Sequence, residues 1–451
     1  MRAPELDQAL GLEVYATSTA GIGGVIRGSV DDFMVEEVLV DGSAARNEKN
    51  YDGKALGAST SRQRYLLCVL VKRNWDTFVA LKNVAEQLGI DQTRIHIAGI
   101  KDAKAVTAQH ITIENVTMED AQKIRVKDIE VRPVGYFRDE LSPFYLLGNR
   151  FTITISKVEG TALTVKKRLT ETMQQLGAFG GIPNFFGHQR FGTTRAITHL
   201  VGKAIVNGDF EEAVMLFLAK PSPHEHPESR QAREMLESTR DFAEALQSFP
   251  KQLRFERLML RHLAGAPSDF VGAIQRLPFK LQMLFVQAYQ SYLFNRFLSE
   301  RIHRGLLLNT AEVGDFVVNV ERSGLPMVKT GKLASASSLA EINELIRAGK
   351  LRVALPLVGF RQKFSQGAMG EIEKRILETE LVNTDGFRVT EMPRISGQGE
   401  LRTVVSPIRN FNVQFAGEGR LTLGFLLLRG SYATMLLREI MKPRDLIAAG
   451  F

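Results

Sequence analysis

The chain has 451 residues, of which 44% are hydrophobic and 24% charged, so it can bury large cores and should form two or three globular units. A single cysteine, Cys68, excludes a disulfide framework and a cysteine-based zinc site. With no signal-like N-terminus and no run of roughly 20 apolar residues, the sequence predicts a soluble cytoplasmic protein without a membrane partner.

The charge balance permits a polyanionic partner, because the formal net charge is +8 and the pI is near 9.4. Residues 151–200 carry six Lys/Arg against two Asp/Glu, and residues 385–451 carry nine against six. Eight of those nine are arginines, whose planar fork suits phosphate and base contacts. On charge alone, an ordinary solvated surface is an equal alternative.

The N-terminal part of the chain shows strand patterns first. Residues 25–40 predict a strand, a turn and a second strand, and the polar tract 42–63 predicts a mobile loop. Residues 65–71 predict a buried strand. A helical face made by Phe78, Leu81, Ala85 and Leu88 then ends at Gly89.

The rest of the chain alternates between strand-like and helical texture. Residues 149–158 predict an alternating strand, followed by an amphipathic helix that ends at Gly177. Beyond about Arg195 the sequence predicts mainly helices. Strands are predicted again near the C-terminus, followed by a final helix. The segments are 233–249 and 277–302 (helical), 402–415 and 420–433 (strand-like), and 434–442 (helical). Strand-rich ends around a helical middle predict an α+β domain interrupted by an inserted domain.

Two weak motifs favour ordinary structure. The glycines of 21–24 have no clear strand before them and β-branched residues after them, so they predict a turn into a strand and not a nucleotide-phosphate loop. His224 and His226 could both bind a metal, but flanking prolines and the lack of a third ligand favour a solvated loop. We therefore expect no metal site.

Residues 181–192, "GIPNFFGHQRFG", are poor material for a regular helix or strand and resemble the wall of a pocket. Aromatic faces stack on bases, amides read base edges and arginine meets phosphate. An aromatic-rich core turn is the alternative. The residues of interest are Asn184, Phe185, Phe186, His188, Gln189, Arg190 and Phe191.

Residues 97–113, "IAGIKDAKAVTAQHITI", place a single carboxylate, Asp102, after a predicted strand and a turn at Gly99. Catalytic groups often occupy such strand ends, where a rigid scaffold holds them. Lys101 or Lys104 could keep this carboxylate ionised or hold a phosphate. A surface turn with a casual ion pair is the alternative.

The stretch "AGIKDAKAVTAQ" resembles the catalytic signature of the TruD-type tRNA pseudouridine synthases, and "PNFFGHQRFG" resembles their second signature. The segments "DDFMVEEV", "LLGNRFTITI", "SYLFNRFLSERI", "LPLVG" and "GSYATMLLREI" follow in the family's order, so the resemblance spans nearly the whole chain. It implies an α+β pseudouridine-synthase core with a mixed sheet, interrupted by an α/β insertion domain. The implied domains are residues 1–205 with 385–451 for the core and 206–384 for the insertion, with an RNA-binding cleft between them.

The resemblance also implies roles for individual residues. Asp102 matches the catalytic aspartate and Lys101 the adjoining lysine, while Phe186 matches an aromatic of the uridine pocket. Arg438 and Glu439 fall in the C-terminal signature, with no separate role assigned to either. We predict Asp102 as catalytic and the following as substrate-binding: Lys101, Asn184, Phe186, Gln189, Arg190 and Arg438.

The implied activity is the conversion of a tRNA uridine, in this family usually uridine 13, to pseudouridine without a cofactor. We expect a monomer that binds tRNA and not DNA. The longer 42–63 loop and middle domain are typical of archaeal and eukaryotic-type members, some of which modify other uridines. A noncatalytic tRNA-binding protein or RNA chaperone would use the same fold without Asp102. An RNA methyltransferase, supported only by the glycines of 21–24, would need an adenosyl-methionine site.

Overall fold

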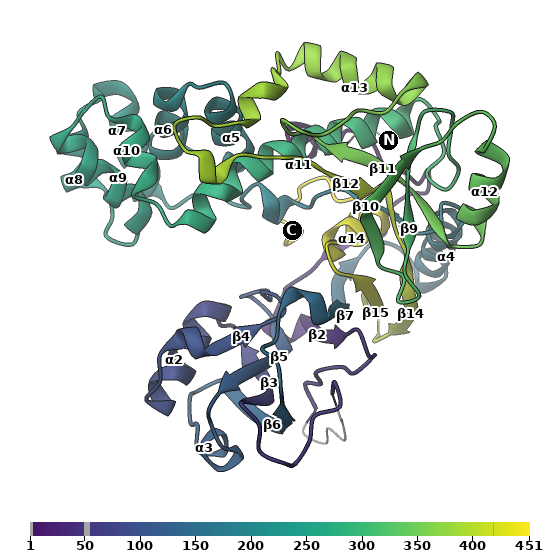
Figure 1. The fold of residues 1–451 in the computed structure, drawn as a ribbon, viewed down its shortest axis with the longest axis horizontal. Helices are drawn as coiled ribbons and strands as arrows, with labels where there is room; N and C mark the ends of the chain where they lie inside the picture. Colours follow the sequence, from purple (N-terminus) through teal and green to yellow (C-terminus); the bar gives the residue numbers. More distant parts are fainter. Residues whose placement is uncertain (1–2, 49–54, 418) are drawn as a thin grey trace. The chain divides into compact units, whose positions relative to one another are not determined.

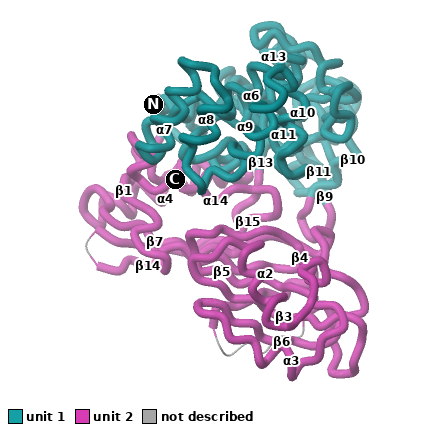
Figure 2. The backbone as a smooth tube through the Cα atoms, turned by 90° about the vertical axis from the view of Figure 1, so that its left-hand side faces the viewer, with its two compact units in different colours: residues 1–18, 183–320, 326–405 teal, residues 19–182, 321–325, 406–451 magenta. Residues whose placement is uncertain are grey.

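The computed structural model describes residues 3–48, 55–417 and 419–451. Contacts between Cα atoms divide the chain into two compact units, each assembled from segments that are distant in sequence (Figure 2). Unit 1 comprises residues 1–18, 183–320 and 326–405, and unit 2 comprises residues 19–182, 321–325 and 406–451. The chain passes between the units after residues 18, 182, 320, 325 and 405, and two of these points lie within β8 (Ile182–Pro183) and β13 (Val405–Ser406).

Unit 2 is built on a nine-stranded sheet. Seven of its strands follow the order β14-β15-β7-β2-β5-β3-β6 (Figure 1), and the other two are β1, which pairs with β7, and β4, which pairs with β5. Within the described residues, β2 and β5 run parallel while the other neighbours run antiparallel, so the sheet is mixed as predicted. The strands are β1 (Gly23–Val25), β2 (Phe33–Leu39), β3 (Tyr65–Arg73), β4 (Ile95–Ile97), β5 (Val106–Glu114), β6 (Ile129–Phe137), β7 (Leu146–Val158), β14 (Ile408–Phe415) and β15 (Arg420–Leu428).

The alternation predicted for residues 149–158 is present in β7. Phe151, Ile153 and Ile155 are buried, whereas Thr152 and Thr154 on the opposite face are half-buried. Successive side chains of a strand point to opposite faces, so this pattern gives the sheet one apolar and one polar face here. On the apolar face, Phe151 stacks on Phe425 of β15 with ring centroids 5.3 Å apart.

Among its described residues, unit 2 contains the α-helices α2 (Thr77–Leu88), α3 (Met118–Gln122), α4 (Ala162–Ala178) and α14 (Ala433–Met441). As predicted, α2 ends at Gly89, which has the left-handed φ of 64°. Its side chains pack with α3 over β3, β5 and β6, where the predicted strand buries Cys68.

Two details of these helices differ from the sequence prediction. Phe78 is 39% exposed, because the buried face of α2 runs through Ala80, Leu81, Val84 and Ala85. Helix α4 does not end at Gly177 but continues through it to Ala178, since one glycine costs a helix only about 1 kcal/mol.

The polar tract 42–63 is only partly described, because residues 49–54 lie outside the described residues. The tract packs more than its composition predicts. Ala44, Ala45 and Ala55 are all buried, and the backbone N–H of Ala45 donates to the carbonyl of Glu37 in β2 at 2.8 Å. Small apolar side chains in a polar segment give no periodic signal, so the sequence did not reveal this packing.

Unit 1 is mainly helical, and its central element is the 25-residue helix α11, which packs against α5, α13 and β11. The predicted helical segment 233–249 is two helices, because Arg240 adopts the left-handed φ of 55° between them. The helices are α1 (Glu5–Ala9), α5 (Thr198–Val206), α6 (Phe210–Leu218), α7 (Pro227–Thr239), α8 (Phe242–Ser248), α9 (Arg254–Gly265), α10 (Phe270–Gln275), α11 (Phe279–His303), α12 (Leu339–Arg347) and α13 (Gly367–Thr379).

Unit 1 also contains a four-stranded antiparallel sheet with the order β10-β9-β11-β12. Its strands are β9 (Phe316–Val320), β10 (Pro326–Leu333), β11 (Leu351–Leu357) and β12 (Glu400–Thr403). The sequence predicted a helical middle of the chain, and this prediction missed most of the sheet. Short apolar runs do not distinguish a strand from a helix by their periodicity. Helices combined with mixed and antiparallel sheets confirm the predicted α+β class.

Candidate functional site

Asp102 lies where the sequence placed it, in the loop that joins β4 to β5. The loop backbone is anchored from three sides. Nζ of the buried Lys72 donates to the carbonyl of Asp102 at 2.7 Å, and the Thr77 hydroxyl lies within hydrogen-bond distance of both the N–H and the carbonyl of Lys101. The Gln109 amide donates to the carbonyl of Gly99 at 3.1 Å. The Asp102 side chain remains 36% exposed, so a carboxylate on a fixed backbone is open to solvent.

Arg27 is the cation in contact with this carboxylate. Its Nη2 lies 3.5 Å from Oδ1 of Asp102, while Nη1 donates to the carbonyl of Gly450 at 2.7 Å. The guanidinium carbon sits 4.2 Å from the centroid of the Phe33 ring. Burial lowers the pKa of Arg27 and the nearby Asp102 charge opposes this shift. The sequence reasoning missed Arg27, which follows the strand β1 as a lone arginine without any periodic signal.

Lys101 adjoins Asp102 in sequence, but its ammonium points elsewhere. Its Nζ lies 2.6 Å from Oε2 of Glu37, and both side chains are buried. His110 contributes a further contact, with Nδ1 lying 3.3 Å from Oε1 of Glu37. Burial acts to raise the pKa of Glu37, but Lys101 and His110 outweigh it and the pKa lies below its usual value. Lys101 is thus part of a buried ionic cluster beneath the loop, while Lys104 is exposed.

The second signature lies in unit 1, where Asn184 and Phe186 are both buried. The Asn184 amide donates to the carbonyl of Thr403 at 3.0 Å, and its Oδ1 accepts from Nη2 of Arg402 at 2.8 Å. Phe186 packs edge-on against Phe294. The guanidinium of Arg402 lies over the Phe186 ring, 4.0 Å from its centroid. Sequence reasoning did not single out Arg402, which lies 218 positions from Asn184.

Gln189 and Arg190 belong to the short 3-10 helix η4 (His188–Arg190). Gln189 is exposed. Arg190 donates from Nε to the Ser291 hydroxyl and from Nη2 to the Gln287 amide oxygen, each at 3.2 Å, and lies 5.7 Å from the Phe186 ring. Both Phe186 and Arg190 line a pocket of about 380 Å³ in unit 1. The structure therefore brings these two predicted residues together around Arg402.

Arg438 and Glu439 are buried in α14 of unit 2 and contact each other, with Nη1 of Arg438 lying 3.6 Å from Oε1 of Glu439. Arg438 does not line the pocket that contains Phe186 and Arg190. His224 and His226 are exposed, as a solvated loop predicts, but Glu225 between them is bound by Arg233 at 2.9 Å.

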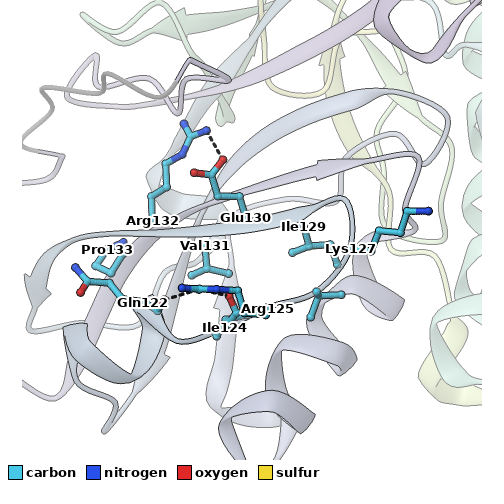
Figure 3. Close-up of a pocket in the computed structure, with 10 residues that line it drawn as sticks. Gln122, Ile124, Arg125, Lys127, Ile129, Glu130, Val131, Arg132 and Pro133 are labelled. Carbon is cyan, nitrogen blue, oxygen red and sulfur yellow. Dashed lines mark hydrogen bonds and ion pairs between the residues drawn. The ribbon is translucent and has the colours of Figure 1, made fainter.

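Another pocket, of about 740 Å³, lies beside α3 and β6 of unit 2 (Figure 3). None of the predicted site residues line it. Its arginines are tied to the protein itself, since Arg125 donates to the carbonyls of Gln122 and Ile124 and Arg132 pairs with Glu130 at 2.6 Å. Within the described parts of the chain, no cluster of His, Cys, Asp and Glu is arranged to hold a metal ion, and no helix has the length and apolarity that crossing a membrane requires.

Known proteins match this chain along almost its whole length. A family model described as tRNA pseudouridine synthase D (TruD) matches residues 9–440. A Methanosarcina acetivorans protein named "Probable tRNA pseudouridine synthase D" is 39% identical over 447 residues, which span 98% of each chain. A Methanopyrus kandleri protein of the same name is 39% identical over 388 residues, 86% of this chain and 88% of that one.

A solved structure agrees with the sequence matches. The crystal structure of a Methanosarcina mazei protein described as tRNA pseudouridine synthase D (TruD) matches with a TM-score of 0.82 at 36% sequence identity, covering 98% of this chain and 99% of that one. The fold is therefore that of an α+β pseudouridine synthase, as predicted. The chain belongs to the tRNA pseudouridine synthase D (TruD) family, a family of isomerases that act in tRNA processing.

Proposed function

We propose that this enzyme converts a uridine of tRNA, uridine 13 in particular, to pseudouridine, and that Asp102 carries the chemistry without a cofactor. The observation that carries this proposal is the partly exposed Asp102 carboxylate on an anchored loop, paired with Arg27 at 3.5 Å. The protein would act as a monomer in the cytoplasm, with tRNA and not DNA as its partner.

The reaction needs a carboxylate and no outside group. The N1–C1′ bond breaks, the uracil turns, and a new bond joins C5 to C1′, while the proton on C5 is lost and N1 gains one, so product and substrate are isomers. An ionised Asp102 serves this sequence either as a nucleophile at C1′ or as a base that takes the 2′ proton. Arg27 supports both roles because it compensates the negative charge and holds the carboxylate in place.

The reacting uridine must leave its stack before a side chain can reach C1′. We assign RNA binding to the predicted residues Lys101, Asn184, Phe186, Gln189, Arg190 and Arg438. An aromatic surface contributes about 1–3 kcal/mol per stacked base, which fits Phe186 as part of the uridine pocket. Lys101 and Arg438 would act from within the protein, since both are buried. In this proposal the core domain is residues 1–205 with 385–451 and the insertion is 206–384.

A single assay tests the proposed function. Purified protein is incubated with an unmodified tRNA transcript and no additive, and pseudouridine is mapped by carbodiimide-blocked primer extension. We expect one primer-extension stop, which reports a pseudouridine at position 13. The stop should disappear when the transcript has cytidine at that position. Binding without any pseudouridine would indicate a noncatalytic tRNA-binding protein or RNA chaperone, and a stop elsewhere would correct the target uridine.

A further inference from the structure

The pocket of about 380 Å³ in unit 1 is lined by an unusual set of charges. Its ionisable residues are three arginines, Arg190, Arg394 and Arg402, against one glutamate, Glu400. Glu400 is exposed to solvent. Guanidinium groups gathered in one concave site suit an anion, because their planar donors match the oxygens of a phosphate.

Arg402 is the most strongly positioned of the three. Its Nε donates to the carbonyl of Asn184 at 2.9 Å and its Nη2 to the Asn184 side-chain oxygen at 2.8 Å. The guanidinium also lies 4.0 Å from the Phe186 ring centroid and 5.6 Å from that of Phe294. Two hydrogen bonds and an aromatic face leave this group little rotational freedom, so its orientation is fixed before any ligand arrives.

Asn184, which orients Arg402, is itself held by β12 and the residues after it. Its side-chain amide lies 3.0 Å from the Thr403 carbonyl and 3.3 Å from the Thr403 hydroxyl, and its backbone N–H donates to the carbonyl of Val404 at 2.8 Å. Arg402 lies on β12 opposite Leu355 of β11. Rigid strands thus support both partners, and such support keeps a binding group within the narrow tolerance that recognition needs.

The other two arginines add charge at the same pocket. Arg190 is held by Ser291 and Gln287 of α11. Arg394 is exposed and lies 4.4 Å from the ring centroid of Phe279, at the start of that helix. A guanidinium that stacks on a ring through its face keeps its N–H groups at its edge, where hydrogen-bond acceptors approach.

We propose that this pocket binds a backbone phosphate of the tRNA, with Arg402 as its main contact, and that Asn184 and Phe186 are positioning residues for Arg402. The proposal rests on the proposed function, since the phosphate belongs to the tRNA substrate. In this proposal, residues of the second signature also hold the Arg402 guanidinium in place for contact with the RNA backbone beside the uridine pocket.

Binding of unmodified tRNA tests the assignment of Arg402. Affinity is measured between 50 and 200 mM salt for the parent, Arg402→Gln, Arg402→Lys and the control Arg388→Gln. Arg388 is exposed and lies 4.8 Å from the Phe360 ring centroid, but it does not line the pocket. We expect Arg402→Gln to weaken binding about tenfold and to reduce the slope of log K against log salt by about 1. Arg402→Lys should keep the slope and lose part of the affinity, and the control should change neither.

A double-mutant cycle tests the positioning role of Phe186. Phe186→Leu should weaken tRNA binding clearly less in the Arg402→Gln background than in the parent, because part of its effect passes through the guanidinium and only the stacking contribution remains. Additive losses would overturn the positioning role. If Arg402→Gln lowers Tm by more than a few degrees, tRNA affinity is compared at a temperature at which both proteins are folded, and a parental affinity and salt slope in Arg402→Gln overturn the phosphate contact.

Two further arms separate this proposal from related ones. Inorganic phosphate is titrated against the parent protein. If phosphate binds through Arg402 while tRNA affinity is unchanged in Arg402→Gln, the pocket serves a free anion and the proposal is wrong. Pseudouridine formation by the parent is measured in parallel. Its absence would count against the proposed function, whereas normal activity with unaltered tRNA binding by Arg402→Gln would overturn the phosphate site alone.

Discussion

Arg27 joins three parts of unit 2 at the candidate catalytic carboxylate. It bonds Asp102, donates to the carbonyl of Gly450 near the C-terminus, and lies over Phe33 of β2. Its backbone adopts the left-handed φ of 59°, which is uncommon for a residue other than glycine. Such geometry persists only where the surroundings hold it, so the fold fixes the backbone from which this side chain reaches Asp102.

Replacing Arg27 should therefore affect chemistry more than RNA binding. We expect Arg27→Met to lower the rate of pseudouridine formation at least tenfold, which is about 1.4 kcal/mol of barrier, because Asp102 loses its compensating charge. Single-turnover rates at saturating protein measure this effect, and tRNA affinity should stay within about threefold.

The matched control is Arg64→Met. Arg64 also pairs with a carboxylate, Glu114, at 2.8 Å and lies 5.3 Å from an aromatic ring, that of Tyr65, but it is largely exposed and its partner is the last residue of β5, at the opposite end of that strand from the Asp102 loop. Its replacement should leave the rate unchanged. An equal loss of rate in both variants would show that Arg27 has no special relation to Asp102.

At the scale of elements, helix α13 is attached to the preceding loop by a buried carboxylate. Glu373 accepts hydrogen bonds from the N–H of Ser365 at 2.8 Å and from its hydroxyl at 2.7 Å. Burial raises the pKa of Glu373 to about 7, against opposing effects of the Ser365 hydrogen bonds. Since the folded pKa exceeds the unfolded one, the stabilisation from proton binding is complete below about pH 4.5 and is lost as the pH rises through 7.

Glu373→Gln should remove this pH dependence, because the amide keeps an acceptor for Ser365 and cannot ionise. Between pH 4.5 and pH 7, the Tm of Glu373→Gln should therefore rise by a few degrees relative to the Tm of the parent. The exposed Glu371 on the same helix provides the control, Glu371→Gln. A difference in Tm that is constant with pH would mean that Glu373 titrates normally.

Local elements were more predictable from the sequence than the contacts that complete the site. The strand, loop and strand around Asp102, and helix α2 with its glycine end, follow from local pattern. Arg27 lies 75 positions from Asp102 and Arg402 lies 218 from Asn184, and no local pattern specifies such pairs because the sheets bring them together. The strands β9 to β12 were hidden for a related reason, since their short apolar runs have no period that excludes a helix.

At the scale of the whole molecule, the net charge of +8 predicts salt-dependent binding of tRNA. Each phosphate that a Lys or Arg neutralises releases counterions, so affinity falls as a power of the salt concentration. We expect the dissociation constant to rise at least tenfold between 50 and 200 mM salt, as measured by filter binding. Tm is recorded at the same salt concentrations to show that the protein stays folded. A flat response would contradict an electrostatic interface.

Asp102→Asn tests the proposed chemistry most directly. The asparagine keeps nearly the same size, and the Lys72 hydrogen bond to the backbone carbonyl of residue 102 is independent of the side chain. The variant should therefore fold and bind tRNA like the parent, or slightly more tightly. The control is Asp31→Asn, which removes another arginine-paired carboxylate in unit 2, the exposed partner of Arg73.

The decisive measurement is pseudouridine formation by these two variants on unmodified tRNA, with a melting curve for each. An amide neither attacks C1′ effectively nor accepts the 2′ proton, so Asp102→Asn should form no detectable pseudouridine while Asp31→Asn forms it at the parental rate. A folded Asp102→Asn variant that retains activity within tenfold of the parent, about 1.4 kcal/mol of barrier, would contradict an essential role of this carboxylate.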